Sequence, residues 1–380
     1  MSRKKTFLCL TVAMVLVACN SLKMDNNLST GAGLQDIKAA PEPPCAFPQR
    51  IWAACDFELA RKDVTWLGQV ESSAIPTYPG NRAAGRAVQL ADGPQKILCI
   101  QPAYYPRLGG KDFIYFRYFL KGTTSLDLQL FIRDKKFCRQ ARLTGLAEGI
   151  WSEATVDLGR VTETPGGSIV EGERMGGLVM TIHPAHQGAG CELIVDDIIC
   201  FSDDERAEPL SGEPFPGRVI CLWGFDVLDY YHPWTHRNYW VLREGEMVGN
   251  DWGVAQALPR ENRAGKQIRL IIDPPQQVGA ETRLRFRYFL KGTSSFQVQI
   301  FDLTDMDNRH IVLKDIEKGR WRSAELDFTR DGIKNDGDQT LFRAGSLVDD
   351  IFFFPLDAGE DVELLIDDVV LYDAGGGCQQ

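Results

Sequence analysis

The sequence predicts an all-β protein made of two tandem β-sandwich domains. Three observations predict it: a long internal repeat, apolar and polar residues that alternate with a period of two inside each copy, and no sustained helical stripe after the N-terminal segment. A period of two places successive side chains on opposite faces of a strand. A sheet with one apolar face packs that face against a second layer, so each copy is expected to form a sandwich.

The internal repeat covers most of the chain. Residues 116–131 and 286–301 are identical at 11 of 16 positions, and both stretches begin with Phe-Arg-Tyr-Phe-Leu-Lys-Gly-Thr. The likeness extends to an Asp-Asp pair near the end of each copy, at 196–197 and 367–368. A period of about 170 residues is too long for a solenoid, so it indicates two copies of one domain.

The shared stretch reads as two strands joined by a short turn at Lys-Gly-Thr, and we expect an antiparallel hairpin there. Its polar face would carry Arg117 and Gln129 in the first copy, with Arg287 and Gln299 as their counterparts. These side chains either form a ligand surface or simply solvate an exposed sheet, and we favour the second interpretation.

Residues 1–18 are predicted to be a signal peptide, because Arg3, Lys4 and Lys5 precede an apolar stretch that is short for a membrane span. The stretch ends in Leu-Val-Ala-Cys, which resembles the lipobox of bacterial lipoproteins. That resemblance implies cleavage before Cys19 and a lipid on its sulfur, and Asn20 after it implies the outer membrane. The mature protein would then face the periplasm or the cell surface. An ordinary secretory signal is the alternative.

Loss of the signal peptide removes three positive charges and no acids, which changes the net charge from −10 to −13. This acidity argues against nucleic acid as a partner, because nucleic-acid binding needs a basic surface. The expected organisation is a polar, Pro-containing tether, a first domain, a Pro/Gly/acid-rich linker, a second domain and a short tail, at residues 19–44, 45–204, 205–217, 218–374 and 375–380.

The cysteine count fits an exported protein. Apart from Cys19 and the signal peptide, the first domain has six cysteines, and two more, Cys221 and Cys378, flank the second domain. Even counts favour disulfides in an oxidising compartment. We expect a Cys221–Cys378 disulfide, because the first and last strands of each copy should be neighbours. The same reasoning pairs Cys55 with Cys200.

The order of motifs in each copy is Phe-Glu or Phe-Asp near the start, the shared stretch, a tryptophan, and an apolar strand interrupted by Asp-Asp. This order resembles the galactose-binding-like jelly roll of carbohydrate-binding modules. The resemblance implies jelly-roll sandwiches, carbohydrate binding and a structural Ca²⁺ between the early acid and the Asp pair. Residue by residue, it implies Glu58 with Asp197 and Asp226 with Asp368 as ligands. Alternatively, these acids only cap the sheet edge.

A dense aromatic segment in the second domain is the predicted ligand site. Aromatic faces stack on the C–H groups of sugar rings, and neighbouring polar groups give directional hydrogen bonds. The candidate residues are Tyr230, Tyr231, Trp234, His236, Tyr239, Trp240 and Trp252. The competing interpretation is that some of these rings close the end of the sandwich as core.

No catalytic signature is present, and His183 and His186 read as part of a turn rather than a metal site. We therefore expect a non-catalytic cell-envelope lipoprotein that binds polysaccharide. One alternative is a structural or protein-interaction lipoprotein with the same fold, which would have those rings buried and a flat apolar patch elsewhere. A polysaccharide-degrading enzyme is the second alternative.

Overall fold

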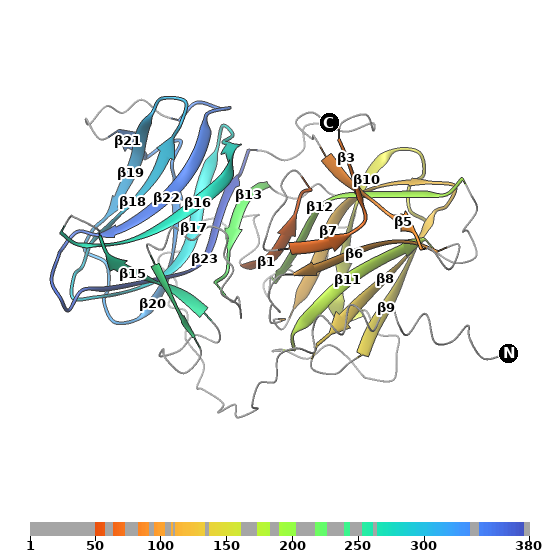
Figure 1. The fold of residues 1–380 in the computed structure, drawn as a ribbon, viewed down its shortest axis with the longest axis horizontal. Coiled ribbons are helices and arrows are strands. Elements are labelled where there is room, and N and C mark those ends of the chain that lie inside the picture. Colours follow the sequence, from red (N-terminus) through yellow and green to blue (C-terminus); the bar gives the residue numbers. More distant parts are fainter. Residues whose placement is uncertain are drawn as a thin grey trace. The chain divides into compact units, whose positions relative to one another are not determined.

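The computed structural model consists of β-strands joined by turns and loops (Figure 1). It describes residues 50–57, 64–72, 83–90, 95–102, 108, 111–133, 137–160, 173–182, 190–202, 217–225, 239–243, 253–260, 264–334 and 342–375. Within these ranges the one helical segment is the 3₁₀ turn η1 (Leu158–Arg160). The all-β prediction is confirmed.

The first sandwich has two sheets of six strands each. One sheet has the order β10 (Trp151–Asp157), β7 (Asp112–Lys121), β12 (Glu192–Ser202), β4 (Ala83–Arg86) and β3 (Gln69–Ser72), with β1 (Arg50–Cys55) also paired to β12. The other has the order β2 (Val64–Leu67), β6 (Lys96–Pro102), β11 (Met175–Ile182), β8 (Ser125–Ile132) and β9 (Phe137–Thr144), with β5 (Val88–Gln89) paired to β6.

The core of the first sandwich follows from the alternation along β7 and β8. Phe116 and Leu120 of β7 and Leu126 and Leu130 of β8 are each 0% exposed and belong to one apolar cluster. Burial of such a side chain stabilises the fold by about 1.5–3 kcal/mol. The polar residues between them lie on the outer faces of the two sheets.

The expected hairpin between β7 and β8 is wrong. The two strands belong to different sheets, so Gly122, with φ of 72°, lies in a connection that crosses from one layer to the other. A hairpin would place both apolar faces on one side of a single sheet, whereas a crossing connection places them face to face across the core. Both arrangements give the same period of two, so the alternation does not distinguish them.

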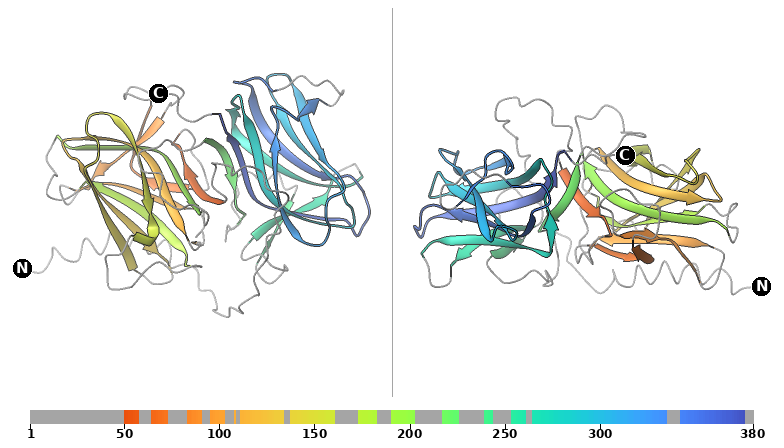
Figure 2. Two further views of the ribbon diagram at one scale, coloured as in Figure 1. Left: turned by 180° about the vertical axis from the view of Figure 1, so that it is seen from behind. Right: turned by 90° about the horizontal axis from the view of Figure 1, so that it is seen from above.

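The second sandwich is one sheet of eleven strands that curls so that its two halves enclose a core. Its order is β20 (Trp321–Asp327), β17 (Thr282–Lys291), β23 (Glu363–Asp373), β15 (Gly253–Pro259), β16 (Lys266–Gln277), β22 (Leu347–Pro355), β18 (Phe296–Asp302), β19 (Asp307–Leu313) and β21 (Ile333–Lys334), with β13 (Arg218–Trp223) on β23 and β14 (Tyr239–Arg243) on β15. Figure 2 shows the layers from two further directions.

The two copies match in backbone detail. In each, the first strand pairs with the last, β1 with β12 and β13 with β23, which confirms that expectation. Trp151 lies opposite Phe119 and Trp321 lies opposite Phe289. The N–H of Gly149 donates to the Leu120 carbonyl at 2.8 Å, and its counterpart at residue 319 donates to residue 290 at the same distance. The repeat therefore preserves strand register and turn geometry as well as sequence.

A third apolar cluster takes residues from both sandwiches. Its members are Ile51, Ala54, Phe113, Tyr115, Ile199 and Phe201 of the first and Val219, Leu222, Val370 and Tyr372 of the second. Each is at most 7% exposed.

Candidate functional site

Most of the predicted aromatic ligand site lies outside the described residues. Tyr230, Tyr231, Trp234, His236 and Trp252 are all there, so their role stays a prediction. Tyr239 and Trp240 belong to β14, where their backbones lie opposite Ala257 and Gln256 of β15. That strand links the aromatic segment to the edge of a sheet.

The described residues reveal a second aromatic site that the sequence did not indicate. It lies on the outer face of the half-sheet β16–β22–β18–β19. Ile351 and Phe353 of β22 point into the core, so the alternating residues Phe352 and Phe354 point outward. One row across these strands contains His310, Gln299, Phe352 and Arg269 as successive register partners, and Gln297 lies opposite Phe354. We call the set Phe352, Phe354, Arg269, Gln297, Gln299 and His310 the Phe352 face.

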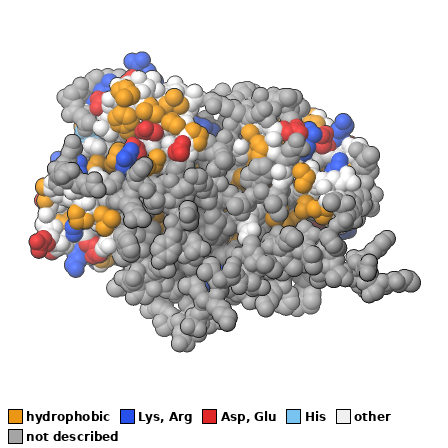
Figure 3. All heavy atoms as spheres, viewed as in Figure 1, with side chains coloured by type: hydrophobic (Ala, Val, Ile, Leu, Met, Phe, Trp, Pro, Cys, Tyr) orange, Lys and Arg blue, Asp and Glu red, His pale blue; other side chains and the backbone are white. Residues whose placement is uncertain are grey.

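The two outward phenylalanines pack against each other as a stacked pair of rings, the platform of this face. Their ring centroids are 5.6 Å apart and their planes differ by 11°. The Arg269 guanidinium lies 5.5 Å from the centroid of Phe352, and the Arg260 guanidinium lies 4.9 Å from that of Phe354. All members of the face are half-buried. In the space-filling view, hydrophobic side chains gather over the region of β16, β18 and β22 with acidic and basic side chains among them (Figure 3).

A buried carboxylate holds Arg269 in place on this face. Arg269 donates from Nε and Nη2 to the two carboxylate oxygens of Asp350, at 2.8 and 2.7 Å. The side chain of Asp350 is 8% exposed. The hydrogen bond to Asp350 raises the pKa of Arg269 above its usual value, although burial opposes the shift. The pairing fixes the guanidinium plane and compensates its charge.

His310 completes the row as a neutral group. Burial lowers the pKa of His310, and the nearby Asp307 only partly opposes the effect. The imidazole is therefore uncharged at neutral pH and offers one donor and one acceptor. With Gln297 and Gln299 it gives the platform a border of uncharged polar groups.

The equivalent face of the first sandwich lacks the platform. Val179 and Thr181 of β11 occupy the register positions that correspond to Phe352 and Phe354, since they lie opposite Gln129 and Asp127 of β8. Cys99 lies where the second copy has Arg269. The aromatic pair is thus specific to the second sandwich.

The polar hairpin face expected around Arg117 and Gln129 does not exist. Arg117 is on β7 and Gln129 on β8, which belong to opposite sheets of the first sandwich. Arg287 and Gln299 are separated in the same way, with four strands between theirs in the sheet order. Only Gln299 of this group contributes to the Phe352 face.

The closing strands place their Asp pairs at matching irregularities. Asp197 and Asp368 both have φ of 46°, in the left-handed region, and the backbone N–H of each donates to the carboxylate of the preceding Asp, at 2.9 and 2.8 Å. The preceding acids, Asp196 and Asp367, are 1% and 4% exposed. Left-handed backbone also occurs at Phe57 and at its counterpart, just before the early acids.

The calcium prediction stays untested as a whole, because Glu58 and Asp226 lie outside the described residues. The described members, Asp197 and Asp368, do not fit a divalent cation. Arg117 Nη1 is 3.9 Å from Asp197 Oδ2, and Arg287 Nη1 is 3.4 Å from Asp368 Oδ2. A Ca²⁺ on either carboxylate would lie roughly 5–6 Å from the guanidinium and be repelled by about 6 kcal/mol at an effective dielectric constant of about 20.

The cysteine predictions have different outcomes. Cys378 lies outside the described residues, so the Cys221–Cys378 disulfide stays a prediction. The structure does not join Cys55 to Cys200, and that expectation is wrong. The register explains the result, since Cys200 lies opposite Ala53 and Cys55 opposite Ile198. The two cysteines are diagonal neighbours, and diagonal pairs are farther apart than a disulfide requires.

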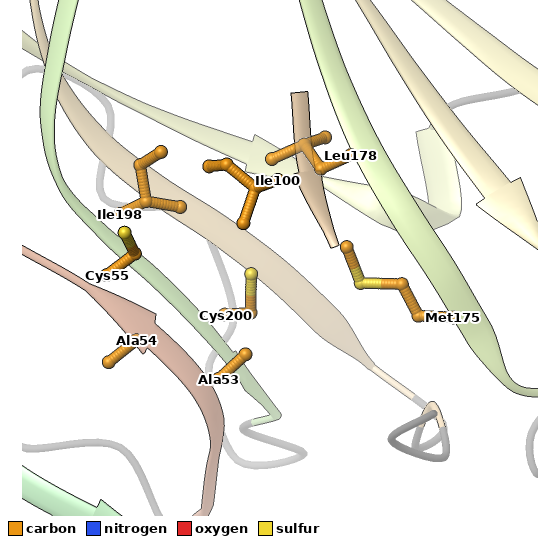
Figure 4. A pocket seen from close by; sticks show the side chains of 8 residues that line it. All are labelled: Ala53, Ala54, Cys55, Ile100, Met175, Leu178, Ile198 and Cys200. Atoms are coloured by element: carbon orange, nitrogen blue, oxygen red, sulfur yellow. The ribbon is translucent and has the colours of Figure 1, made fainter. Parts of the chain in front are cut away.

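A small pocket inside the first sandwich surrounds these two cysteines (Figure 4). Its lining is Ala53, Ala54, Cys55, Ile100, Met175, Leu178, Ile198 and Cys200. Burial raises the pKa of the Cys200 thiol well above its ordinary value, with smaller contributions from Cys55 and Asp112. The lining consists of alanine, isoleucine, leucine, methionine and cysteine side chains, so it contains no Lys, Arg, Asp or Glu to orient a polar ligand.

The predicted lipid site, Cys19, lies outside the described residues. In the part of the chain that the structure describes, no helix has the length and apolar character needed to cross a membrane.

No family model and no curated protein matches this chain. Similar solved structures include the tandem CBM22-1–CBM22-2 domains of Paenibacillus barcinonensis Xyn10C, with 12% identity, 88% of this chain and 99% of that one covered, and a TM-score of 0.29. A structure of promiscuous carbohydrate-binding modules of the β-sandwich superfamily has 8% identity, 72% and 91% coverage, and a TM-score of 0.25. An arabinose-bound α-L-arabinofuranosidase, MgGH51, has 9% identity and a TM-score of 0.28, and covers 41% of this chain but only 25% of its own.

Proposed function

We propose that the protein is a non-catalytic, lipid-anchored glycan-binding protein of the cell envelope, and that the Phe352 face holds the glycan. One observation carries this proposal: two stacked, nearly parallel rings, 5.6 Å apart between centroids, lie on an outward sheet face with Arg269 and uncharged polar side chains around them. The aromatic segment that includes Trp234 and Trp240 is a second part of the proposed site.

The chemistry of the face suits a sugar better than a protein surface. An aromatic ring matches the C–H face of a pyranose, and Gln297, Gln299 and His310 supply the donors and acceptors that hydroxyl groups need. The rings are half-buried rather than part of a wide apolar patch, which is what a stable protein interface would use.

Binding without catalysis is proposed because the carboxylate that holds Arg269 on this face is already engaged. A glycosidase needs two carboxyl groups that both reach the scissile bond. Asp350 gives both of its oxygens to Arg269. Asp349, its neighbour, has a raised pKa because of burial and the charge of Asp350. If the wild-type protein hydrolyses a bound glycan and the Asp349→Asn variant does not, the polysaccharide-degrading alternative is supported instead.

The proposal is tested by screening the mature full chain on an array of polysaccharides and measuring the strongest interaction by calorimetry. Phe352→Ala and Phe354→Ala should each weaken binding by about 10-fold or more, since loss of one stacking ring costs about 1–3 kcal/mol. Phe131→Ala, a half-buried outward ring on β8 of the first sandwich, is the matched control and should bind normally.

Three results would redirect the proposal. Loss of binding in Trp234→Ala or Trp240→Ala with normal binding in both phenylalanine variants would place the site in the aromatic segment. If Phe131→Ala loses as much glycan affinity as the Phe352 and Phe354 variants, the losses reflect general destabilisation of the protein. A wild-type protein that binds no polysaccharide but retains a partner protein on the Phe352 face would favour the interaction role.

The lipid anchor rests on the Leu-Val-Ala-Cys sequence before Asn20. Metabolic labelling with a fatty-acid analogue should mark the wild-type protein and not Cys19→Ser, and the variant should move from the membrane fraction to the soluble fraction. An unlabelled wild-type protein that is secreted after cleavage would support the ordinary secretory signal.

A further inference from the structure

The closing strand of each sandwich carries a buried acid pair that needs a positive partner. Asp196 and Asp367 are almost fully buried, and the side chains of Asp197 and Asp368 are 20% and 18% exposed. A buried carboxylate stays ionised at low cost only when an opposite charge or several hydrogen bonds face it.

An arginine on the neighbouring strand faces each pair. Arg117 lies opposite Asp196 in the register of β7 and β12, and Arg287 lies opposite Asp367 in the register of β17 and β23. Each guanidinium then reaches the second acid of the pair, at 3.9 Å in the first sandwich and 3.4 Å in the second. The side chain of Arg117 is only 7% exposed.

The same arginine is fixed on its other side by tryptophan. The Arg117 guanidinium lies 6.0 Å from the ring centroid of Trp151, and the Arg287 guanidinium lies 5.4 Å from that of Trp321. An ammonium or guanidinium over an indole is attracted by the ring, so the tryptophan both positions the cation and shields it from water. The arginine, the tryptophan and the acid pair therefore form one unit that occurs twice.

We propose that Arg117 and Arg287 are built-in structural cations that neutralise the acid pairs of the two closing strands, at the position where the resemblance to calcium-containing modules implies a metal ion. The guanidinium supplies the positive charge that the metal ion would supply, and it cannot dissociate from the chain. It bridges the closing strand to its neighbour from inside the chain, so the stability of this region does not depend on the Ca²⁺ concentration.

The surroundings of the two units differ, which supports the arginine as the constant element. Glu153 lies opposite Arg117 and is 3.6 Å from it, whereas Ser323 takes the corresponding place opposite Arg287. Asp368 has a second arginine, Arg50, at 3.8 Å. The acids around the arginine change in number between the copies, but the arginine, its tryptophan and the Asp pair do not.

The test compares thermal unfolding of the mature full chain with millimolar CaCl₂ and with EDTA, together with calorimetric titration of CaCl₂. The wild-type protein should unfold at the same temperature in both buffers and show no heat of Ca²⁺ binding. Arg287→Met keeps the packing on Trp321 but removes the charge, and it should lower the unfolding temperature by about 3–6 °C. Arg287→Lys restores a cation and should recover part of the loss.

Added CaCl₂ distinguishes a charge-neutralising role of Arg287 from a role in packing alone. With the Arg287 guanidinium gone, the acid pair loses the cation of its own sandwich and keeps Arg50 at 3.8 Å from Asp368, so CaCl₂ should raise the unfolding temperature of Arg287→Met and not that of the wild type. Arg320→Met, which removes a half-exposed arginine paired with Glu317 on the same sandwich, is the control and should show neither effect. A wild-type protein that binds Ca²⁺ and loses stability in EDTA would overturn the proposal, as would an Arg287→Met variant as stable as the wild type. If Arg287→Met does not fold, the wild-type titration and Arg287→Lys still decide the question.

Discussion

The salt bridge between Arg269 and Asp350 has an almost identical counterpart at the surface of the same sandwich. Arg269 donates from Nε and Nη2 to Asp350 at 2.8 and 2.7 Å, and Arg330 donates from the same atoms to Asp331 at 2.9 and 2.7 Å. The two pairs differ in burial. The side chains of Arg269 and Asp350 are 33% and 8% exposed, against 72% and 46% for the surface pair.

The same Asp→Asn substitution can therefore be made in a largely buried pair and in an exposed pair. Asp350→Asn keeps the shape of the side chain but leaves a guanidinium facing a neutral amide beneath a sheet surface. Loss of a partner in a fully buried pair costs about 3–5 kcal/mol. Because a third of Arg269 reaches solvent and the amide oxygen still accepts one hydrogen bond, we expect about 1–3 kcal/mol. For a domain of this size that corresponds to a fall of about 3–8 °C in unfolding temperature.

Asp331→Asn should change the free energy of unfolding by less than about 0.5 kcal/mol, since exposed pairs contribute little. Urea unfolding of both variants at neutral pH measures the difference, and calorimetry with the bound glycan measures a second effect. Asp350→Asn should also weaken glycan binding, because Arg269 loses the partner that holds it over Phe352. Equal stability losses in the two variants would refute the argument that burial, rather than hydrogen-bond geometry, sets the contribution of this pair.

Three further predictions concern other parts of the chain. Burial raises the pKa of Glu325, but the charge of Arg285 and its neighbours outweighs it and leaves the pKa below 4.5. The stability that Glu325 contributes is thus present above that pH and lost in acid. Glu325→Gln should therefore destabilise the protein to urea at neutral pH and not in acid. A loss of stability that does not depend on pH would contradict this. Gly85→Ala would bring its Cβ within 2.5 Å of the buried Phe57 ring and should lower the free energy of unfolding by about 1–3 kcal/mol in urea. An unchanged urea midpoint would show that the ring moves aside freely. Burial raises the pKa of Cys99 to about 11, so iodoacetamide should label it only after unfolding, and labelling of the native protein, seen by mass spectrometry, would be the contrary result.

The repeat made much of the fold predictable from the sequence. Duplication identified two domains and showed that Asp197 and Asp368 hold equivalent places, and alternation identified the strands and their apolar faces. Alternation says nothing about which layer a strand joins, so the connection through Gly122 was read as a hairpin although it crosses the core. Local pattern does not reveal partners distant in sequence either, which is why Arg117, about 80 residues before its acid pair, was assigned to a solvated face.

The Phe352 face was missed for a different physical reason. The strand around it reads Asp-Ile-Phe-Phe-Phe-Pro, a continuous apolar run in which no residue stands out as exposed. Such a run fits a strand buried on both faces as well as a strand with an aromatic outer face. Only the register, which places Phe353 in the core, assigns Phe352 and Phe354 to the outside.

The two copies share the residues that the fold requires and differ at positions where the fold accepts different side chains. Each sandwich keeps the arginine, tryptophan and Asp pair and the same turn at Gly149 or Gly319, so these features belong to the scaffold. On the outer face, by contrast, Val179 of the first sandwich stands where Phe352 stands in the second. A sheet that folds with valine at this position does not need a half-buried outward phenylalanine for stability, and contact of an apolar ring with water is unfavourable. A covering ligand would remove this cost, so the proposed glycan contact on this face belongs to the second sandwich alone.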